Sequence, residues 1–342
     1  MKGKTLAISA ALMVLLTGGW LGLQKTPAVS DTAGKLLLPA LQGRTERITQ
    51  IEVMRPNEPL LKLAKKGDHW QLPLPEQADK AYPAAVSTVG SLLRALVEAK
   101  TVEAKTRRAE QHARLNLAEQ GEGGATRIRL EFKGAPALEL LVGKAAQQGD
   151  GQLVRLASDN QVWLIDQGIP LPQDTFLGWI NRRISSIPAD EIKAIELSFT
   201  EEQDGYKSLQ LSRDKADEPF KVKPAGDTAM PAVQDASARL SRLFAALNLS
   251  EVKTKLPEDS TALLDFSISG FEQERLTGKL FQQKSAQEGP SGAYWLSFTD
   301  ESNAPAAWLP AGRHWVWRIE DFAGQTLFEA LPKALTAKAE SE

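Results

Sequence analysis

Residues 79–96, DKAYPAAVSTVGSLLRAL, place an acidic residue, a proline and a leucine-rich stretch in an order that the chain uses twice. Residues 227–247, DTAMPAVQDASARLSRLFAAL, repeat this order further along. In both stretches apolar residues recur every three or four positions, which predicts an amphipathic helix from Pro83 to about Ala99 and a second one ending at Leu247. Pro83 suits a first helical turn, and Asp79 can supply acceptor oxygens or favourable charge there. The apolar positions at helical spacing are Tyr82, Val86, Val89, Leu93 and Leu96 for the first helix and Val233, Ala236, Leu240, Leu243 and Leu247 for the second.

Short segments of alternating apolar and polar residues surround each predicted helix. Alternation at period two predicts strands with one dry face, which is typical of antiparallel sheets. The expected strands contain Ile51 and Val53, Leu61 and Leu63, Trp70 and Leu72, Ile128 to Phe132, Leu138 and Leu140, and Val162 to Ile165 in the first half. They contain Ile195 to Phe199, Leu209 and Leu211, Phe220 and Val222, Phe266 and Ile268, Tyr294 and Leu296, and Val316 to Ile319 in the second half.

The order of these segments predicts an α+β fold made of two tandem, diverged copies of a mostly antiparallel sheet packed with an amphipathic helix. We expect an anchor or signal peptide at residues 1–24, a spacer at 25–47, a first module at 48–188, a second module at 189–336 and a disordered tail at 337–342. A short helix is expected at Phe176–Ile180, and a linker at Ser185–Ala194.

Residues 5–23 carry no charge and, as a helix, would rise about 28 Å, close to the hydrocarbon thickness of a bilayer. Because Lys2 and Lys4 precede this segment, we expect a single-pass inner-membrane protein with a cytoplasmic N-terminus and a periplasmic body. The alternative is a cleaved signal peptide, since Ala28-Val29-Ser30 offers small residues for a peptidase. Both interpretations export the body.

Composition limits the classes of function. A formal net charge of −2 and a pI near 6.1 argue against nucleic acid as a partner. The absence of cysteine excludes disulfides, thiolate metal sites and cysteine nucleophiles.

We find no motif that predicts catalysis, a metal site or a nucleotide site. His69, His112 and His314 are too dispersed for a ligand set, and Gly143-Lys144-Ala145 and Gly121–Gly124 lack the signature of a phosphate loop. Ser267-Ile268-Ser269-Gly270 has no evident base nearby. The acidic pairs Glu201-Glu202 and Glu258-Asp259 are typical of solvated turns. We therefore expect no catalytic, cofactor-binding or metal-binding residues, and no enzymatic activity.

Two further groups of residues could face a partner. The basic residues Lys100, Lys105, Arg107, Arg108 and Arg114 alternate with acidic ones, which favours a solvated face. In the last strands, Trp163, Trp315 and Trp317 alternate with apolar neighbours, so both faces of those strands need cover from a helix, the other module or a partner protein.

The run Leu37–Arg44, followed by Ile48, Ile51–Val53, Trp70 and the first helix, resembles the bacterial family known as domain of unknown function 4340. The resemblance covers most of the chain and is clearest from residue 36 to residue 187. It implies an N-terminal membrane segment and an exported α+β body, sometimes encoded beside ABC-transporter auxiliary components of the gliding-motility type. It implies no catalytic residue.

These observations favour a non-enzymatic, membrane-anchored periplasmic accessory or scaffold protein of an envelope or ABC-type transport complex. The alternative is a periplasmic module that binds a glycan or lipid in a groove between the two modules, which exposed Trp179 or Trp308 lining one cleft would favour. A third hypothesis, a carboxylate hydrolase, requires two acidic groups that converge in a pocket.

Overall fold

The structure is a computed structural model that describes residues 33–174, 176–224, 234–284, 292–299 and 303–339. Within these ranges no helix is both long and apolar enough to span a bilayer. The predicted membrane segment, residues 5–23, lies outside the described residues.

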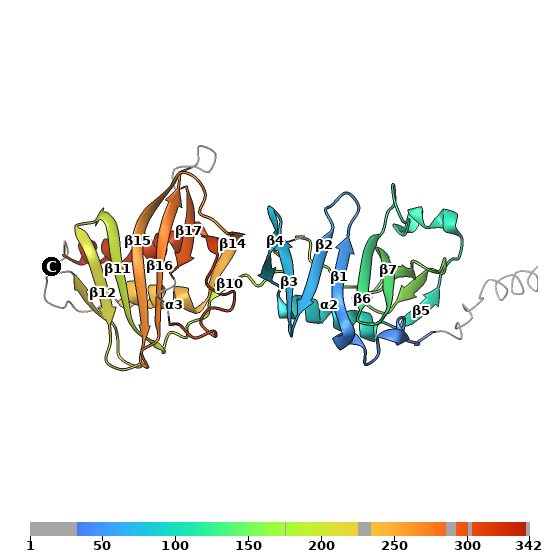
Figure 1. Cartoon of the computed structure of the whole chain (residues 1–342), viewed down its shortest axis with the longest axis horizontal. Coiled ribbons are helices and arrows are strands. Elements are labelled where there is room, and N and C mark those ends of the chain that lie inside the picture. Colours follow the sequence, from blue (N-terminus) through green and yellow to red (C-terminus); the bar gives the residue numbers. More distant parts are fainter. Residues whose placement is uncertain (1–32, 175, 225–233, 285–291, 300–302, 340–342) are drawn as a thin grey trace, which may run out of the picture. The chain divides into compact units, whose positions relative to one another are not determined.

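The first sheet has nine described strands in the order β4-β3-β2-β1-β6-β7-β8-β9-β5 (Figure 1). The strand pairs with a defined register are antiparallel, as the alternating sequence predicts. The elements are η1 (Pro39–Leu41), η2 (Thr45–Arg47), β1 (Ile48–Met54), β2 (Leu61–Lys66), β3 (His69–Leu74), β4 (Gln77–Pro83), α2 (Val86–Glu98), β5 (Thr101–Ala104), η3 (Ala109–Gln111), η4 (Ala113–Leu115), β6 (Thr126–Phe132), β7 (Ala135–Ala145), β8 (Gln152–Leu156) and β9 (Trp163–Ile165).

The second sheet also has nine described strands, in the order β10-β14-β18-β17-β16-β15-β11-β12-β13, and its strand pairs are antiparallel. Its elements are β10 (Arg183–Ser185), β11 (Ile192–Gln203), β12 (Tyr206–Ser212), β13 (Lys221–Pro224), α3 (Gln234–Ala245), β14 (Leu247–Lys253), β15 (Ser260–Gly270), β16 (Arg275–Gln283), β17 (Ala293–Phe298), β18 (Val316–Ile319), α4 (Asp321–Phe328) and α5 (Ala330–Ala339).

The two sheets share one connectivity. Read from β3, the first sheet runs β3-β2-β1-β6-β7-β8-β9-β5; read from β13, the second runs β13-β12-β11-β15-β16-β17-β18-β14. In both sheets, the helix comes in the chain immediately before the strand that ends this series. Helix α2 precedes β5, and helix α3 precedes β14. The second sheet then adds β10 beside β14, whereas in the first sheet Leu36 forms a single bridge to Lys100 next to β5.

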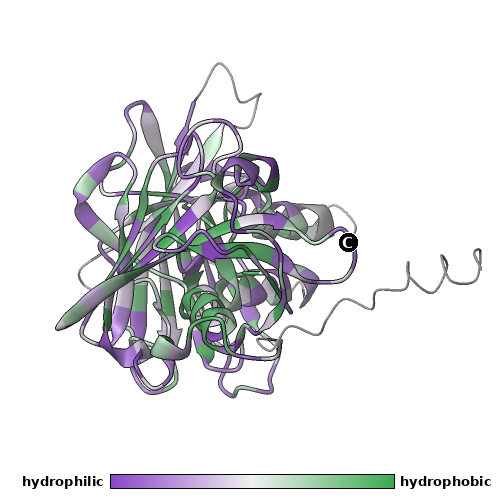
Figure 2. Ribbon diagram, turned by 90° about the vertical axis from the view of Figure 1, so that its right-hand side faces the viewer, coloured by the Kyte–Doolittle hydropathy of each residue, from purple (hydrophilic) through white to green (hydrophobic). Residues whose placement is uncertain are grey.

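The described residues form two compact units, the first from residues 33–65 and 89–171 and the second from the described parts of 66–88 and 172–339. The β3–β4 hairpin therefore belongs to the second unit. Figure 2 shows hydrophobic segments, in green, along strands and helices, and hydrophilic segments, in purple, mainly in the turns.

The first helix is shorter than predicted, and its buried face keeps Val89 and Leu96 but has Leu92 in place of Leu93. It begins at Val86, which is 74% exposed, and turns Val89, Leu92 and Leu96 inward. Asp79 is no helix cap, because it lies on β4, where Pro83 ends an extended segment that pairs with β3. Proline disfavours the α conformation at the preceding residue, Tyr82, and the helix starts only after Ala84 and Ala85, whose backbone N atoms donate to Trp70 O and Trp179 O.

Three other boundaries differ from the prediction. Phe176–Ile180 is a turn rather than a helix, since Asp174 Oδ1 accepts hydrogen bonds from the backbone N of Phe176 at 2.8 Å and of Leu177 at 2.5 Å. The second helix stops at Ala245, and Leu247 begins β14. The start of the predicted linker is strand, because Ser185 ends β10.

The N-terminal part of the described chain packs into the core. Leu37, Leu38 and Leu41 are buried, although they lie in the predicted spacer. The Leu37 backbone N donates to Ala99 O at 2.8 Å, which ties this segment to the end of α2.

The helices of the second sheet pack on one face. The Phe244 ring on α3 lies 5.5 Å from that of Phe266 on β15, and Phe328 on α4 lies 6.0 Å from Phe199 on β11. Burial of such aromatic side chains contributes about 1.5–3 kcal/mol each, so this layer supplies much of the core.

Candidate functional site

The described surface of the second unit has a hollow of about 370 Å³ between α3 and α4, which we call the α3–α4 groove. Helix α3 forms one wall, α4 forms the other, and the start of β14 closes one end. Its lining includes Arg239, Arg242, Leu243, Leu247, Phe322 and Thr326.

Among the described residues, Phe322 is the most exposed aromatic residue, with 67% of its surface accessible. The packing of α4 explains this exposure. Gly324 faces the Tyr294 ring so closely that an added Cβ would lie 2.1 Å from it, which fixes the side of α4 that meets the sheet. Ala323, Thr326 and Leu327 are buried with it, so Phe322 is left outside.

Two arginines border the same groove. Arg239 and Arg242 are exposed and three residues apart on α3, a spacing that puts them on the same side of a helix. Arg239 Nε donates to Asp235 O at 3.3 Å, and within the described chain neither guanidinium forms an ion pair. Nearby, Arg183 Nη1 donates to Ala245 O at 3.0 Å, where the negative end of the helix dipole lies.

A larger hollow, of about 510 Å³, lies beside β14 in the second unit. Its central cation, Lys253, has its Nζ 3.1 Å from Glu251 and 3.9 Å from Glu76, and 5.6 Å from the centre of the Trp295 ring. Both carboxylates thus share one lysine as an ion-pair partner. Two acidic side chains therefore line one hollow, as the hydrolase hypothesis requires, and each is paired with Lys253.

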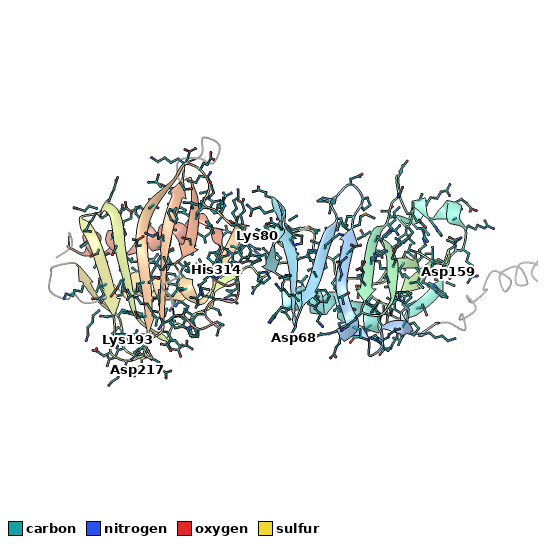
Figure 3. All side chains as sticks on the ribbon, viewed as in Figure 1. Asp68, Lys80, Asp159, Lys193, Asp217 and His314 are labelled. Carbon is teal, nitrogen blue, oxygen red and sulfur yellow. The ribbon has the colours of Figure 1, made fainter. Side chains whose placement is uncertain are left out.

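The predicted histidines do not converge. His112 is 4% exposed and its Nε2 lies 3.1 Å from Asn160 O, a structural contact. His69 is the first residue of β3, and His314 lies just before β18. Figure 3 shows His314 apart from Lys193 and Asp217, two other labelled side chains of the second unit. Among the described residues, no group of three His, Cys, Asp or Glu side chains could hold a metal ion.

The glycine motifs have structural roles. A Cβ on Gly143 would lie 2.5 Å from Leu115 O, and a Cβ on Gly123, which has a φ of +69°, would lie 2.1 Å from Ala113 O. Both glycines thus permit close approach of backbone segments rather than forming a phosphate site.

The remaining sequence candidates lie in ordinary surroundings. Ser267 on β15 accepts a hydrogen bond from Arg275 Nε at 3.1 Å, and Asp259 has a φ of +62° in a turn. Glu201 and Glu202 are exposed at the end of β11.

The basic residues that follow α2 are exposed. Lys105 Nζ lies 2.5 Å from Glu103, and Arg107 Nε donates to Gln161 Oε1 at 2.8 Å. Glu103 thus offsets the charge of Lys105, whereas the neutral Gln161 leaves the charge of Arg107 in place.

The tryptophans singled out for ligand binding are buried. Trp179 is 1% exposed, and Trp308 is 2% exposed with its Nε1 donating to Glu191 at 2.8 Å. Neither side chain is exposed, whereas exposure of either would favour the ligand-binding alternative.

Tyr82 covers Trp317 on β18 and Trp315 just before that strand. Its ring meets Trp315 edge to face at 5.2 Å, and its hydroxyl accepts a hydrogen bond from Trp317 Nε1 at 3.2 Å. Burial raises the pKa of Tyr82, and the hydrogen bond from Trp317 lowers it by less. The cover that the apolar strand required thus comes from the β3–β4 hairpin.

Two buried arginines stabilise the backbone. Arg155 Nε donates to Leu117 O at 3.1 Å in the first unit. In the second unit Arg213 donates to the carbonyl O of Ile192, Ala216 and Ala189, and stacks over Phe220 at 4.5 Å. Desolvation lowers the pKa of Arg213.

The polar face of the first sheet carries paired charges. Glu139 lies 2.5 Å from Arg127 and 2.6 Å from Arg129.

A family model described as "Domain of unknown function (DUF4340)" matches residues 70–267. The matched range begins in β3 and ends in β15, so it includes parts of both sheets. It does not include Leu37–Arg44, the first of the segments that resemble this family. No curated protein and no solved structure matches the chain.

Proposed function

The chain belongs to the DUF4340 family, and we propose that it acts as a non-enzymatic scaffold or accessory protein in a bacterial envelope or ABC-type transport complex. In this proposal residues 5–23 anchor it in the inner membrane, and the body is periplasmic. The two sheets are diverged copies of one unit, an interpretation supported by their shared strand order.

The observation that carries the proposal is the exposed Phe322 beside the α3–α4 groove. A single exposed apolar side chain is ordinary on a protein surface, so the support comes from the position of Phe322 in the lining of a hollow that two arginines also line. Aromatic residues and arginine are also the residue types enriched at the centres of protein–protein interfaces, and Phe322, Arg239 and Arg242 occur here together.

Co-purification of the full chain from membranes after mild chemical crosslinking tests this function. We expect partner proteins to be recovered with the wild type and to be lost with Phe322→Ser. Leu60→Ser is the matched control, because Leu60 is a large apolar residue, 44% exposed, in the first unit. Recovery of the intact chain alone, with no membrane complex, would contradict the scaffold role.

A further inference from the structure

We propose that the α3–α4 groove binds an acidic amphipathic segment of a partner protein, with carboxylates against Arg239 and Arg242 and an apolar side chain beside Phe322. This inference rests on the proposed scaffold function and specifies the chemistry of the partner.

The two arginines on the α3 side of the groove point to an acidic occupant on that side, whereas Glu320 lines the groove on the α4 side. Arg239 and Arg242 extend from one side of α3, and in the described chain no carboxylate pairs with either of them. Arg127 and Arg129, which lie on the first sheet, are both paired with Glu139. A guanidinium binds a carboxylate through two parallel hydrogen bonds, so a pair of unpaired arginines fits two acidic side chains one helical turn apart.

The shape of the groove points to an apolar contact beside those charges. Its volume of about 370 Å³ is at the lower end of the range for pockets that bind small ligands, about 300–1,000 Å³. Leu243 and Ala323 line it, and Phe322 is exposed at its edge. An amphipathic helix that lays its apolar side chains into a groove, with acidic residues along one margin, matches both features.

A protein segment fits better than an anionic membrane surface. Glu320 and Asp321 directly precede Phe322 and are exposed. Their charge would repel anionic headgroups as the Phe322 ring approached the lipid. A peptide can direct its acidic residues toward α3 and away from these two carboxylates.

A photoreactive amino acid at position 322 of the full chain, activated in intact membranes, tests the inference. Mass spectrometry of the crosslinked peptide should show Asp or Glu within one helical turn of the attachment point. The same photoreactive residue at Lys215, an exposed position with a side chain 74% accessible in the second unit, should give no such peptide.

Charge reversal provides the second readout. Arg239→Glu with Arg242→Glu should lower the crosslink yield roughly tenfold, because two attractive contacts become repulsive. Replacing the partner's acidic residues by Lys should restore it. Arg94→Glu, which reverses an exposed arginine on α2, is the control and should leave the yield unchanged. All three arginines are exposed, so unchanged thermal unfolding should show that the variants fold.

The outcomes separate the two proposals. A crosslinked peptide without acidic residues, a lipid adduct, a second copy of this chain, or a yield insensitive to charge reversal overturns the acidic partner and leaves the scaffold function standing. No crosslink at position 322, together with no partner in the co-purification, overturns both.

Discussion

The hydrogen bond between Tyr82 and Trp317 gives the sharpest test of how the second unit is held together. Replacing Tyr82 by Phe removes the hydroxyl that accepts from Trp317 Nε1 at 3.2 Å but keeps the ring that meets Trp315. Both Tyr82 and Trp317 are fully buried. The indole N–H would lose its partner in a place that water does not reach.

An unsatisfied buried donor costs about 1–3 kcal/mol, so we expect Tyr82→Phe to lower the free energy of unfolding by that amount. Tyr82→Ala should cost about 3–5 kcal/mol, since the ring and its packing are lost as well. Urea unfolding followed by tryptophan fluorescence measures both, with the change in midpoint read at constant slope.

Tyr206→Phe is the matched control, because the Tyr206 side chain is only partly buried and the change should stay within about 0.5 kcal/mol. A double-mutant cycle with Trp317→Phe should yield a coupling energy of about 1 kcal/mol between the two side chains. Zero coupling, or a Tyr82→Phe variant as stable as the wild type, would refute this role of the hydrogen bond.

Alkaline pH offers an independent check. Burial raises the pKa of Tyr82 in the folded chain, so its contribution to stability is present below about pH 10, the pKa of an unfolded tyrosine, and is lost as the pH rises above it. The wild type should therefore lose more stability than Tyr82→Phe between neutral and strongly alkaline pH.

Further predictions concern the charges and close contacts of each unit. The pKa of Glu139 is lowered, because partial burial raises it but hydrogen bonds from Arg127 and Arg129 lower it by more. The stability lost in Glu139→Gln should thus be greatest at neutral pH and should vanish in urea titrations as the pH falls through the pKa of folded Glu139. Arg213→Met should lower the free energy of unfolding by about 3 kcal/mol or more, since three carbonyl groups lose their donor. Arg242→Met, at an exposed position, should change it by less than about 0.5 kcal/mol in thermal unfolding. Equal effects of the two substitutions would contradict this role of Arg213. Gly324→Ala should destabilise the protein by about 1–3 kcal/mol, because the added methyl group would contact Tyr294. Gly90→Ala should stabilise it by about 0.5–1 kcal/mol, because Gly90 faces open space on α2. Calorimetry that shows the opposite signs for the two variants would refute the packing of α4.

Periodicity predicted much of the sheet structure, because one face of each strand is buried and the other is solvated. Segments such as Ile51–Val53 and Phe266–Ile268 lie in strands as expected. Other strands follow a misleading local pattern. Leu247 continues the helical spacing of α3 but begins β14, and Asp79 resembles a cap but lies on β4. Pairing with neighbouring strands overrode the local preference in both cases.

The candidate site could not be predicted from local sequence. Arg239 and Arg242 look like the ordinary polar side of an amphipathic helix, and Phe322 follows two acidic residues with no motif around it. The groove exists because Gly324 lets α4 settle on Tyr294, far away in sequence. Such a contact between distant segments has no periodic signal, and only the arrangement of the helices brings these three residues to one groove.

Export of the body is the condition on which a scaffold role in the envelope depends. A reporter that is active only outside the cytoplasm, joined after residue 342 of the full chain, measures it directly. The proposal predicts activity of that reporter in intact cells and none from a matched reporter that works only in the cytoplasm. The reverse pattern would contradict the membrane-anchored periplasmic scaffold.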